Sequence, residues 1–262
     1  MVSPRPLWAN FLPLILLFLI STSWGFCFVL IKIAVTGGID PLGYLFWWSA
    51  LSGTVLLVIG ALRRFRPRFD WPHVRYYLLM GTVRIAIANF LLVSVQQKLP
   101  IGLMSVIMTT VPIFTYALSL LGRLERFVLR RFIGIVFGFA GVLLIVGPRG
   151  SLPDPALAFW VLLGFCTPFL HSCCYIMLSE RFRPPESDSV GLATGMFYTA
   201  AIILLPIALV LERFYPLWPP FNNAELALLG HSLLAGCHFY AIFELIRMAG
   251  ATYMSQANFL SI

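Results

Sequence analysis

The hexapeptide LRRFRP (62–67) returns as LERFYP (211–216), and each copy follows a long uncharged run. A second pair of motifs precedes these runs at nearly the same spacing: DPLG (40–43) before the first copy and DSVG (188–191) before the second. Because the spacing stays nearly constant from one match to the next, the sequence predicts an internal repeat rather than chance similarity.

The composition is that of a membrane protein. Hydrophobic residues make up 60% of the chain, charged residues only 11%, and the mean hydropathy is +0.92. A water-soluble domain carries charge on roughly a quarter of its residues. The sequence therefore predicts a polytopic membrane protein. Its spans are expected to be helices, giving an all-α fold, because lipid offers no hydrogen-bond partner to backbone groups.

Long apolar runs mark the membrane spans. A helix needs about 20 apolar residues to cross roughly 30 Å of hydrocarbon. Such runs predict spans at Phe11–Ala34, Leu42–Leu62, Tyr76–Val95, Pro100–Leu121, Phe132–Val146, Ala156–Leu178, Val190–Leu211 and Leu226–Ile246, and a ninth that begins near Ala251. We therefore expect a first five-helix repeat at residues 1–150 and a second at residues 151–262.

Positive charge is spread unevenly over the predicted loops. With a cytoplasmic amino terminus, the outside loops hold only Lys98, Arg149 and Arg213. The cytoplasmic segments hold Arg5, Arg63, Arg64, Arg66, Arg68, Arg75, Arg123, Arg126, Arg130, Arg131, Arg181, Arg183 and Arg247. The positive-inside rule favours this orientation. We expect a multi-pass protein of a bacterial inner (plasma) membrane, whose partner is the lipid bilayer and not a nucleic acid.

The two repeats are expected to be inverted. Five spans per repeat is an odd number, so the second copy enters the membrane from the opposite side. The loop charges agree, because the loop after the second span is rich in arginine whereas its counterpart after the seventh holds only Arg213. Inverted repeats of this kind build many secondary transporters, in which substrate binds near the midplane between the halves.

The ninth span ends earlier than its counterpart. The Met-Ser pair at 254–255 matches the pair at 104–105, but nothing after it corresponds to GRLERFVLRRFIGIVFGFAGVLLIVGP (122–148). The expectation from the sequence is a C-terminally truncated ten-helix fold, with the ninth helix cut and the tenth missing.

Several motifs of the first repeat resemble a known family. WGFCFVLIK (24–32) is similar to the Trp-Gly…Lys signature of the drug/metabolite transporter superfamily, EamA type. The junction between the fourth and fifth spans resembles the same family through Glu125, Arg126, Gly134, Gly141 and Val142, and Pro112 fits its mid-helix proline. The resemblance implies a ten-helix transporter.

Polar residues at middle depth are the candidates for a substrate cavity: Trp24, Asn89, His171, Tyr175 and His238. An amide such as Asn89 either binds a ligand or bonds a neighbouring helix. The histidines either carry protons or form interhelical hydrogen bonds. His171, Cys174, Cys237 and His238 lack the spacing of a metal motif, so neither a metal nor another cofactor is expected.

Three charged residues are candidates for a gate or an ion pair: Lys32, Arg84 and Glu244. Lys32 lies near the outer end of its span, where its ammonium either reaches water or contacts an anion. Arg84 lies deeper, where charge is costly, so we expect it to face either a water-filled cavity or an acidic partner. Glu244 is the acid available in the equivalent helix of the other repeat, so we expect an Arg84–Glu244 pair on the cytoplasmic side.

The sequence favours a secondary transporter that exports or exchanges a small metabolite, whether amino-acid-like, amphiphilic or drug-like. No nucleotide-binding loop is present, and the first span contains no carboxylate for proton exchange. The alternatives are an intramembrane enzyme acting on a lipid-like substrate, for which no catalytic motif is found, and a receptor or scaffold. A glycine stripe at Gly134, Gly138 and Gly141 favours close helix packing or a homodimer.

Overall fold

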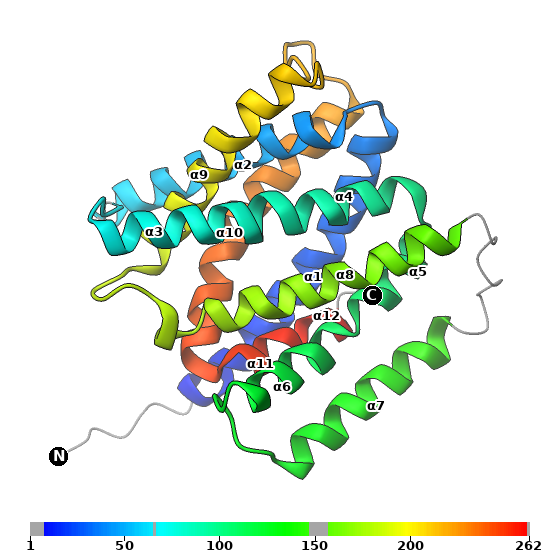
Figure 1. Ribbon diagram of the computed structural model, residues 1–262, viewed down its shortest axis with the longest axis vertical. Helices are drawn as coiled ribbons and strands as arrows, with labels where there is room; N and C mark the ends of the chain where they lie inside the picture. The colour runs from blue at the N-terminus through cyan, green and yellow to red at the C-terminus, as the bar shows by residue number, and fades with distance from the viewer. Residues whose placement is uncertain (1–7, 65–66, 147–156, 261–262) are drawn as a thin grey trace.

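The computed structural model describes residues 8–64, 67–146 and 157–260 (Figure 1). Every regular element within these ranges is helical. The elements are α1 (Trp8–Thr36), α2 (Pro41–Leu62), α3 (Trp71–Met80), the π-helix η1 (Gly81–Ile87), α4 (Ala88–Lys98), α5 (Ile101–Met108), α6 (Val111–Leu121), α7 (Leu129–Val146), α8 (Ala158–Met177), the short 3₁₀ helix η4 (Glu180–Phe182), α9 (Ser189–Val210), α10 (Asn223–Ala249), α11 (Ala251–Ser255) and α12 (Ala257–Leu260). The arginines Arg5, Arg66 and Arg149 lie outside the described residues.

The predicted membrane spans are confirmed as helices. Within the described residues, 7 helical segments are long and apolar enough to cross a membrane. They are α1, α2, the continuous α3–η1–α4 unit, the α5–α6 pair, α8, α9 and α10. The predicted fifth span corresponds to α7, and the ninth begins as expected at Ala251 with α11. The chain is therefore an all-helical, polytopic membrane protein.

The motifs that repeat in the sequence have the same local role in both halves. Asp40 accepts a hydrogen bond from the backbone N–H of Leu42 and caps α2, while Asp188 accepts from Val190 and caps α9. Such caps satisfy backbone N–H groups that have no partner within the helix. Both helices contain 22 residues, and both are followed by a residue with left-handed backbone, Arg64 (φ 57°) and Glu212 (φ 54°). A left-handed residue is a common way for a helix to end.

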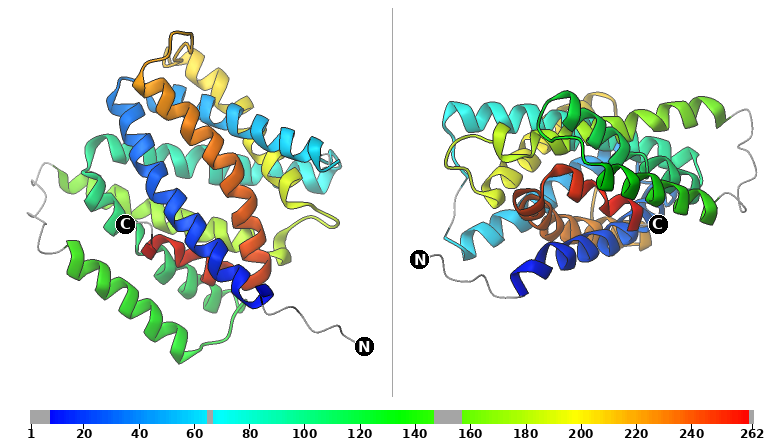
Figure 2. Two further views of the ribbon diagram at one scale, coloured as in Figure 1. Left: turned by 180° about the vertical axis from the view of Figure 1, so that it is seen from behind. Right: turned by 90° about the horizontal axis from the view of Figure 1, so that it is seen from below.

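Helices from the two halves pack directly on one another. α2 contacts α9, α1 contacts α10, and α10 also contacts α2. The same pattern occurs with the halves exchanged, since α8 contacts α4 and η1, and α9 contacts α3 and η1. α1 and α10 run side by side, and α7 lies at the edge of the bundle (Figures 1 and 2). The buried core thus lies between residues of both halves.

Two predicted spans are interrupted. The third span changes from α- to π-helix between Gly81 and Ile87, a feature that the apolar pattern did not predict. The fourth span breaks at Thr109 and Thr110, directly before Pro112 in the first turn of α6. Proline cannot donate a backbone hydrogen bond, so this break has a clear cause.

Glycines permit close contact at two of these packing surfaces. A Cβ atom on Gly81 would lie 2.7 Å from the carbonyl oxygen of Met196, so only glycine allows η1 to approach α9 this closely. In the predicted glycine stripe of α7, a Cβ on Gly138 would lie 2.7 Å from the ring of Phe259 in α12. Gly134 and Gly141 meet nothing within 4 Å. Close packing of the stripe is therefore confirmed at Gly138 alone.

Candidate functional site

A small cavity of about 30 Å³ lies where helices from both halves meet. A water molecule needs roughly 10–15 Å³ of such space, so the cavity has room for very few waters. Its lining residues come from α1, α2, η1, α4, α8 and α10: Trp24, Cys27, Ile31, Trp48, Arg84, Asn89, Leu92, His171, His231, Ala235, His238 and Phe239. We refer to this space as the central cavity.

Arg84 is the charged residue of the central cavity. It lies in η1 and is 1% exposed. Its guanidinium carbon lies 5.6 Å from the ring centroid of Tyr175 and 5.3 Å from that of Phe239. Its Nε and Nη1 atoms have no hydrogen-bond partner in the described part of the chain. Aromatic faces attract a guanidinium, but they do not replace the acceptors that its N–H groups have lost on leaving water.

Asn89 stabilises the π-helix that carries Arg84. Its side-chain Nδ2 donates to the carbonyl oxygen of Arg84 at 2.8 Å and to that of Ile85 at 3.1 Å. A π-helix shifts the backbone hydrogen-bond register, and such segments occur often at functional sites. Asn89 lines the cavity as expected, but its amide donor bonds its own helix and not a neighbouring one.

Each histidine of the central cavity has a hydrogen-bond partner. His171 Nδ1 lies 2.9 Å from the carbonyl oxygen of Thr167, one helical turn earlier. His238 Nδ1 lies 3.0 Å from the hydroxyl of Ser23 in α1. His231 Nδ1 bonds the hydroxyl of Tyr44 in α2. His231 and His238 therefore join α10 to helices of the first half. The expected interhelical hydrogen bond is thus found for His238, whereas His171 bonds its own helix.

Aromatic rings form much of the cavity wall. Trp24 packs edge-on against His238, with ring centroids 5.1 Å apart, and against Tyr175 at 6.4 Å. Trp48 stacks on His231 at 5.3 Å. The indole Nε1 of Trp48 is buried and has no hydrogen-bond partner among the described residues. The cavity thus combines flat apolar faces with N–H donors.

The structure places the five residues predicted for a substrate cavity close together. Trp24, Asn89, His171 and His238 line it, and Tyr175 contacts both Trp24 and Arg84. The sequence prediction did not name the lining residues Cys27, Trp48, His231 and Phe239 as site residues. A helical signal for the last two was available, because His231, Ala235, His238 and Phe239 follow the spacing of a single helix face.

Lys32 and Glu244 lie outside the central cavity. Lys32 Nζ donates to the carbonyl oxygens of Gln96 at 2.7 Å and Leu99 at 3.4 Å, at the C-terminal end of α4. Free carbonyls at a helix C-terminus attract a cation. Lys32 was expected to contact water or an anion, but in this structure it binds the end of α4.

The expected Arg84–Glu244 pair does not form among the described residues. Glu244 accepts hydrogen bonds from Arg247 at 2.7 Å and from the hydroxyl of Ser189 at 3.2 Å. Glu244 lies near the C-terminal end of α10, where Arg247 follows three residues later on the same helix face. Arg84 is instead surrounded by aromatic rings at the depth of the cavity.

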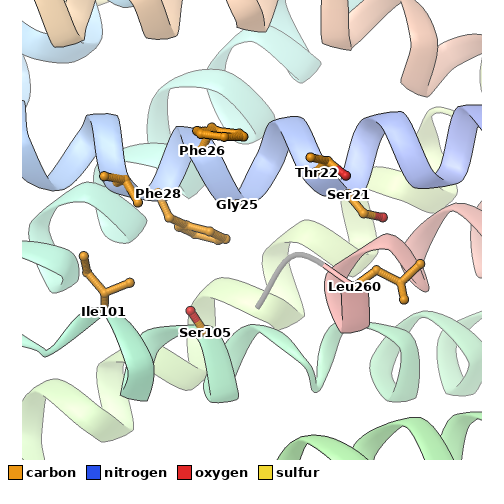
Figure 3. A pocket seen from close by; sticks show the side chains of 9 residues that line it. Ser21, Thr22, Gly25, Phe26, Phe28, Ile101, Ser105 and Leu260 are labelled. Carbon is orange, nitrogen blue, oxygen red and sulfur yellow. The ribbon is translucent and has the colours of Figure 1, made fainter.

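A second hollow lies on the other side of α1. It is a groove of about 400 Å³ between α1 and α5, closed at one end by Leu260 (Figure 3). Ser21, Thr22 and Ser105 supply hydroxyl groups, and Phe26 and Phe28 supply rings. None of the described residues that line the groove is charged. The central cavity, with Arg84, is therefore the better candidate for specific recognition.

Comparison with known proteins adds three findings. Residues 11–147 match the EamA-like transporter family. An uncharacterized transporter of Archaeoglobus fulgidus is 28% identical over 134 residues, which cover 51% of this chain and 47% of that protein, so the match spans about half the length of this relative. A solved crystal structure superposes with a TM-score of 0.67 at 19% identity, over 92% of this chain and 86% of the other. This last likeness concerns the fold alone.

Proposed function

The chain belongs to the EamA-like transporter family, and on that premise we propose that it is a secondary transporter that exports or exchanges a small metabolite by alternating access. The central cavity is the substrate site. The observation that carries this proposal is the buried, unpaired Arg84 in a cavity lined by both halves. A charge at this depth is costly, and in membrane proteins it marks a substrate or ion pathway by default.

The arrangement of the helices supports two inverted repeats, at residues 1–150 and 151–262. If α1, α2 and α3–η1–α4 correspond to α8, α9 and α10, the contacts of α1 and α2 with α10 match those of α8 and α9 with α3–η1–α4, and the α2–α9 contact is its own counterpart. Asp40 and Asp188 cap corresponding helices. Rocking of one repeat against the other is the motion by which such proteins expose a central site to either side in turn.

Contacts between loops support the proposed grouping of the loops on two opposite faces of the membrane. Arg68 forms an ion pair with Glu186 at 2.7 Å, so the loop after α2 lies beside the loop after α8. Arg213 lies 3.8 Å from Asp40, beside the loop before α2. The proposed topology puts the first pair in the cytoplasm and the second outside, with a cytoplasmic amino terminus and, in a bacterium, the inner membrane as its location.

The size of the central cavity supports an occluded conformation. Sites for small molecules usually enclose roughly 300–1,000 Å³, whereas the central cavity encloses about 30 Å³. A metabolite would need the halves to separate before it could enter. The described lining contains no Asp or Glu, so proton exchange through a carboxylate has no support here. Facilitated exchange, or proton transfer through a histidine, remains compatible with the lining.

The test is counterflow in proteoliposomes. The purified protein is reconstituted, loaded with an unlabelled metabolite pool, and assayed for uptake of labelled candidates against protein-free liposomes. Uptake that depends on the internal pool supports transport, and Trp48→Ala should reduce it by opening the cavity wall. Chemical conversion of a candidate without flux would contradict transport and favour the enzyme alternative.

A further inference from the structure

We propose that the central cavity binds a small monocarboxylate anion with an apolar body, and that Arg84 binds its carboxylate. This inference rests on the proposed transport function and names its substrate class.

The hydrogen-bonding character of the cavity indicates an acceptor-rich ligand. Among the described residues that line it, the buried side-chain atoms without a partner are Arg84 Nε, Arg84 Nη1 and Trp48 Nε1. All of these atoms are donors, since neither a guanidinium nor an indole N–H can accept a hydrogen bond. A buried donor without an acceptor costs free energy. A ligand that presents acceptors to these atoms removes that cost.

The charge of the cavity selects one negative charge. A guanidinium stays ionised in proteins, and no ion pair joins Arg84 to an acid within the described ranges. A bound monoanion would neutralise the cavity. A dianionic phosphate would instead leave one excess negative charge in apolar surroundings, which is unfavourable at low dielectric. A carboxylate also matches the planar geometry of a guanidinium.

The rest of the lining indicates the body of the ligand. Ile31 and Leu92 supply aliphatic surface, and Trp24 and Phe239 supply ring faces. A ligand that also carries an ammonium group would find no carboxylate among the described lining residues. The site therefore favours a carboxylate with an apolar body over a zwitterion of the same shape.

The test uses matched probes with the purified protein in lipid nanodiscs. The probes are 3-phenylpropanoate, its neutral amide 3-phenylpropanamide, the zwitterion phenylalanine and 2-phenylethyl phosphate, together with butanoate and butanamide as a smaller pair. Binding is measured as the rise in midpoint of thermal unfolding with ligand concentration, which reports ligand affinity. The variants are Arg84→Gln, Arg84→Lys and, as the matched control, Arg75→Gln, whose arginine is exposed at the start of the same span.

At least one carboxylate should stabilise the wild type, and its amide, the phosphate and the zwitterion should bind more weakly. Because a hydrogen bond to a charged group contributes about 1.5–3 kcal/mol, Arg84→Gln should weaken carboxylate binding roughly 10- to 100-fold. Arg75→Gln should leave it unchanged. Equal binding of carboxylate and amide, equal or tighter binding of the zwitterion or phosphate, or unchanged carboxylate affinity in Arg84→Gln would each overturn the inference.

Flux separates this inference from the function on which it rests. Counterflow of the neutral amides with no response to carboxylates would support transport and overturn the anion site. Binding of carboxylates through Arg84 without flux in either direction would support the site and contradict transport.

Discussion

Replacing Arg84 by methionine should stabilise the protein when no ligand is bound. The guanidinium is 1% exposed and lies near the middle of the Trp71–Lys98 span, where its Nε and Nη1 have no partner. An arginine at the centre of a membrane helix costs about 2.5–3.5 kcal/mol. Its two ring contacts return about 1–2 kcal/mol. Removal of the guanidinium should therefore stabilise the protein by about 0.5–2.5 kcal/mol, since methionine fills irregular space without polar atoms.

This change is large enough to measure. For a chain of this size, 1 kcal/mol shifts the unfolding midpoint by roughly 2–4 °C, so Arg84→Met should raise it by roughly 1–10 °C. The assay is thermal unfolding in one detergent, followed by intrinsic tryptophan fluorescence, with Arg75→Met as the control. The control should stay within about 0.5 kcal/mol of the wild type, because its arginine is exposed.

A fall in the midpoint of Arg84→Met would refute the reasoning. It would mean that Arg84 contributes to stability in the absence of ligand, as it would with a permanent acidic or carbonyl partner. Arg84→Lys separates the charge from the shape, because a lysine keeps the buried charge and should not raise the midpoint.

Four further outcomes follow from the contacts described above. Asn89→Leu should destabilise by about 1–3 kcal/mol, because the carbonyls of Arg84 and Ile85 lose their donor; an unchanged unfolding midpoint would show that the π-helix does not need the amide. Gly81→Ala should destabilise the folded protein by about 1–3 kcal/mol through overpacking, because its Cβ would lie 2.7 Å from the carbonyl oxygen of Met196. As the control, Gly134→Ala should leave the unfolding midpoint unchanged, because its Cβ would meet nothing within 4 Å. Single cysteines at positions 68 and 186 should react with an impermeant maleimide from the cytoplasmic side only, and cysteines at 40 and 213 from the outside only; labelling of either pair from both sides would contradict the topology. Exchange of a transported carboxylate across proteoliposome membranes should be faster than its net efflux, because net efflux requires the empty carrier to bury Arg84 without an acceptor. Equal rates of exchange and net efflux would show that this burial carries no free-energy cost.

The sequence was sufficient for the architecture because the constraints that decide it are local or compositional. Apolar runs of sufficient length can only be helices in lipid, and the positions of these runs match the helices observed. The capping aspartates Asp40 and Asp188 were recognisable as repeated motifs before their role was known. The polar side chains of middle depth also lie together as expected, because facing lipid would leave their polar groups without hydrogen-bond partners.

The sequence was insufficient where the outcome depends on helix register or on competition between partners. The π-helix at Gly81–Ile87 leaves no mark in the hydrophobic pattern, yet it sets the direction of Arg84. Glu244 pairs with Arg247, three residues later in the same helix, and not with Arg84. Lys32 donates to a carbonyl oxygen at the end of α4, a contact that the sequence of its own helix does not predict. The contact of Lys32 depends on the relative rotation of two packed helices, which periodicity alone does not specify.

The unpaired arginine also gives a physical reason for exchange. When the halves close around an empty cavity, Arg84 is buried with no acceptor for its Nε and Nη1. When they close around a carboxylate, the same atoms are bonded and the charge is neutralised. The net cost of about 0.5–2.5 kcal/mol that remains after the ring contacts corresponds to roughly a 2- to 70-fold difference in the populations of these occluded forms. On the proposed function, the loaded carrier then passes through the occluded state more often than the empty carrier does. Return of the carrier with a second substrate is therefore favoured over its return without one. Coupling between the two directions of transport would thus arise from the burial of one charge, without a separate ion site.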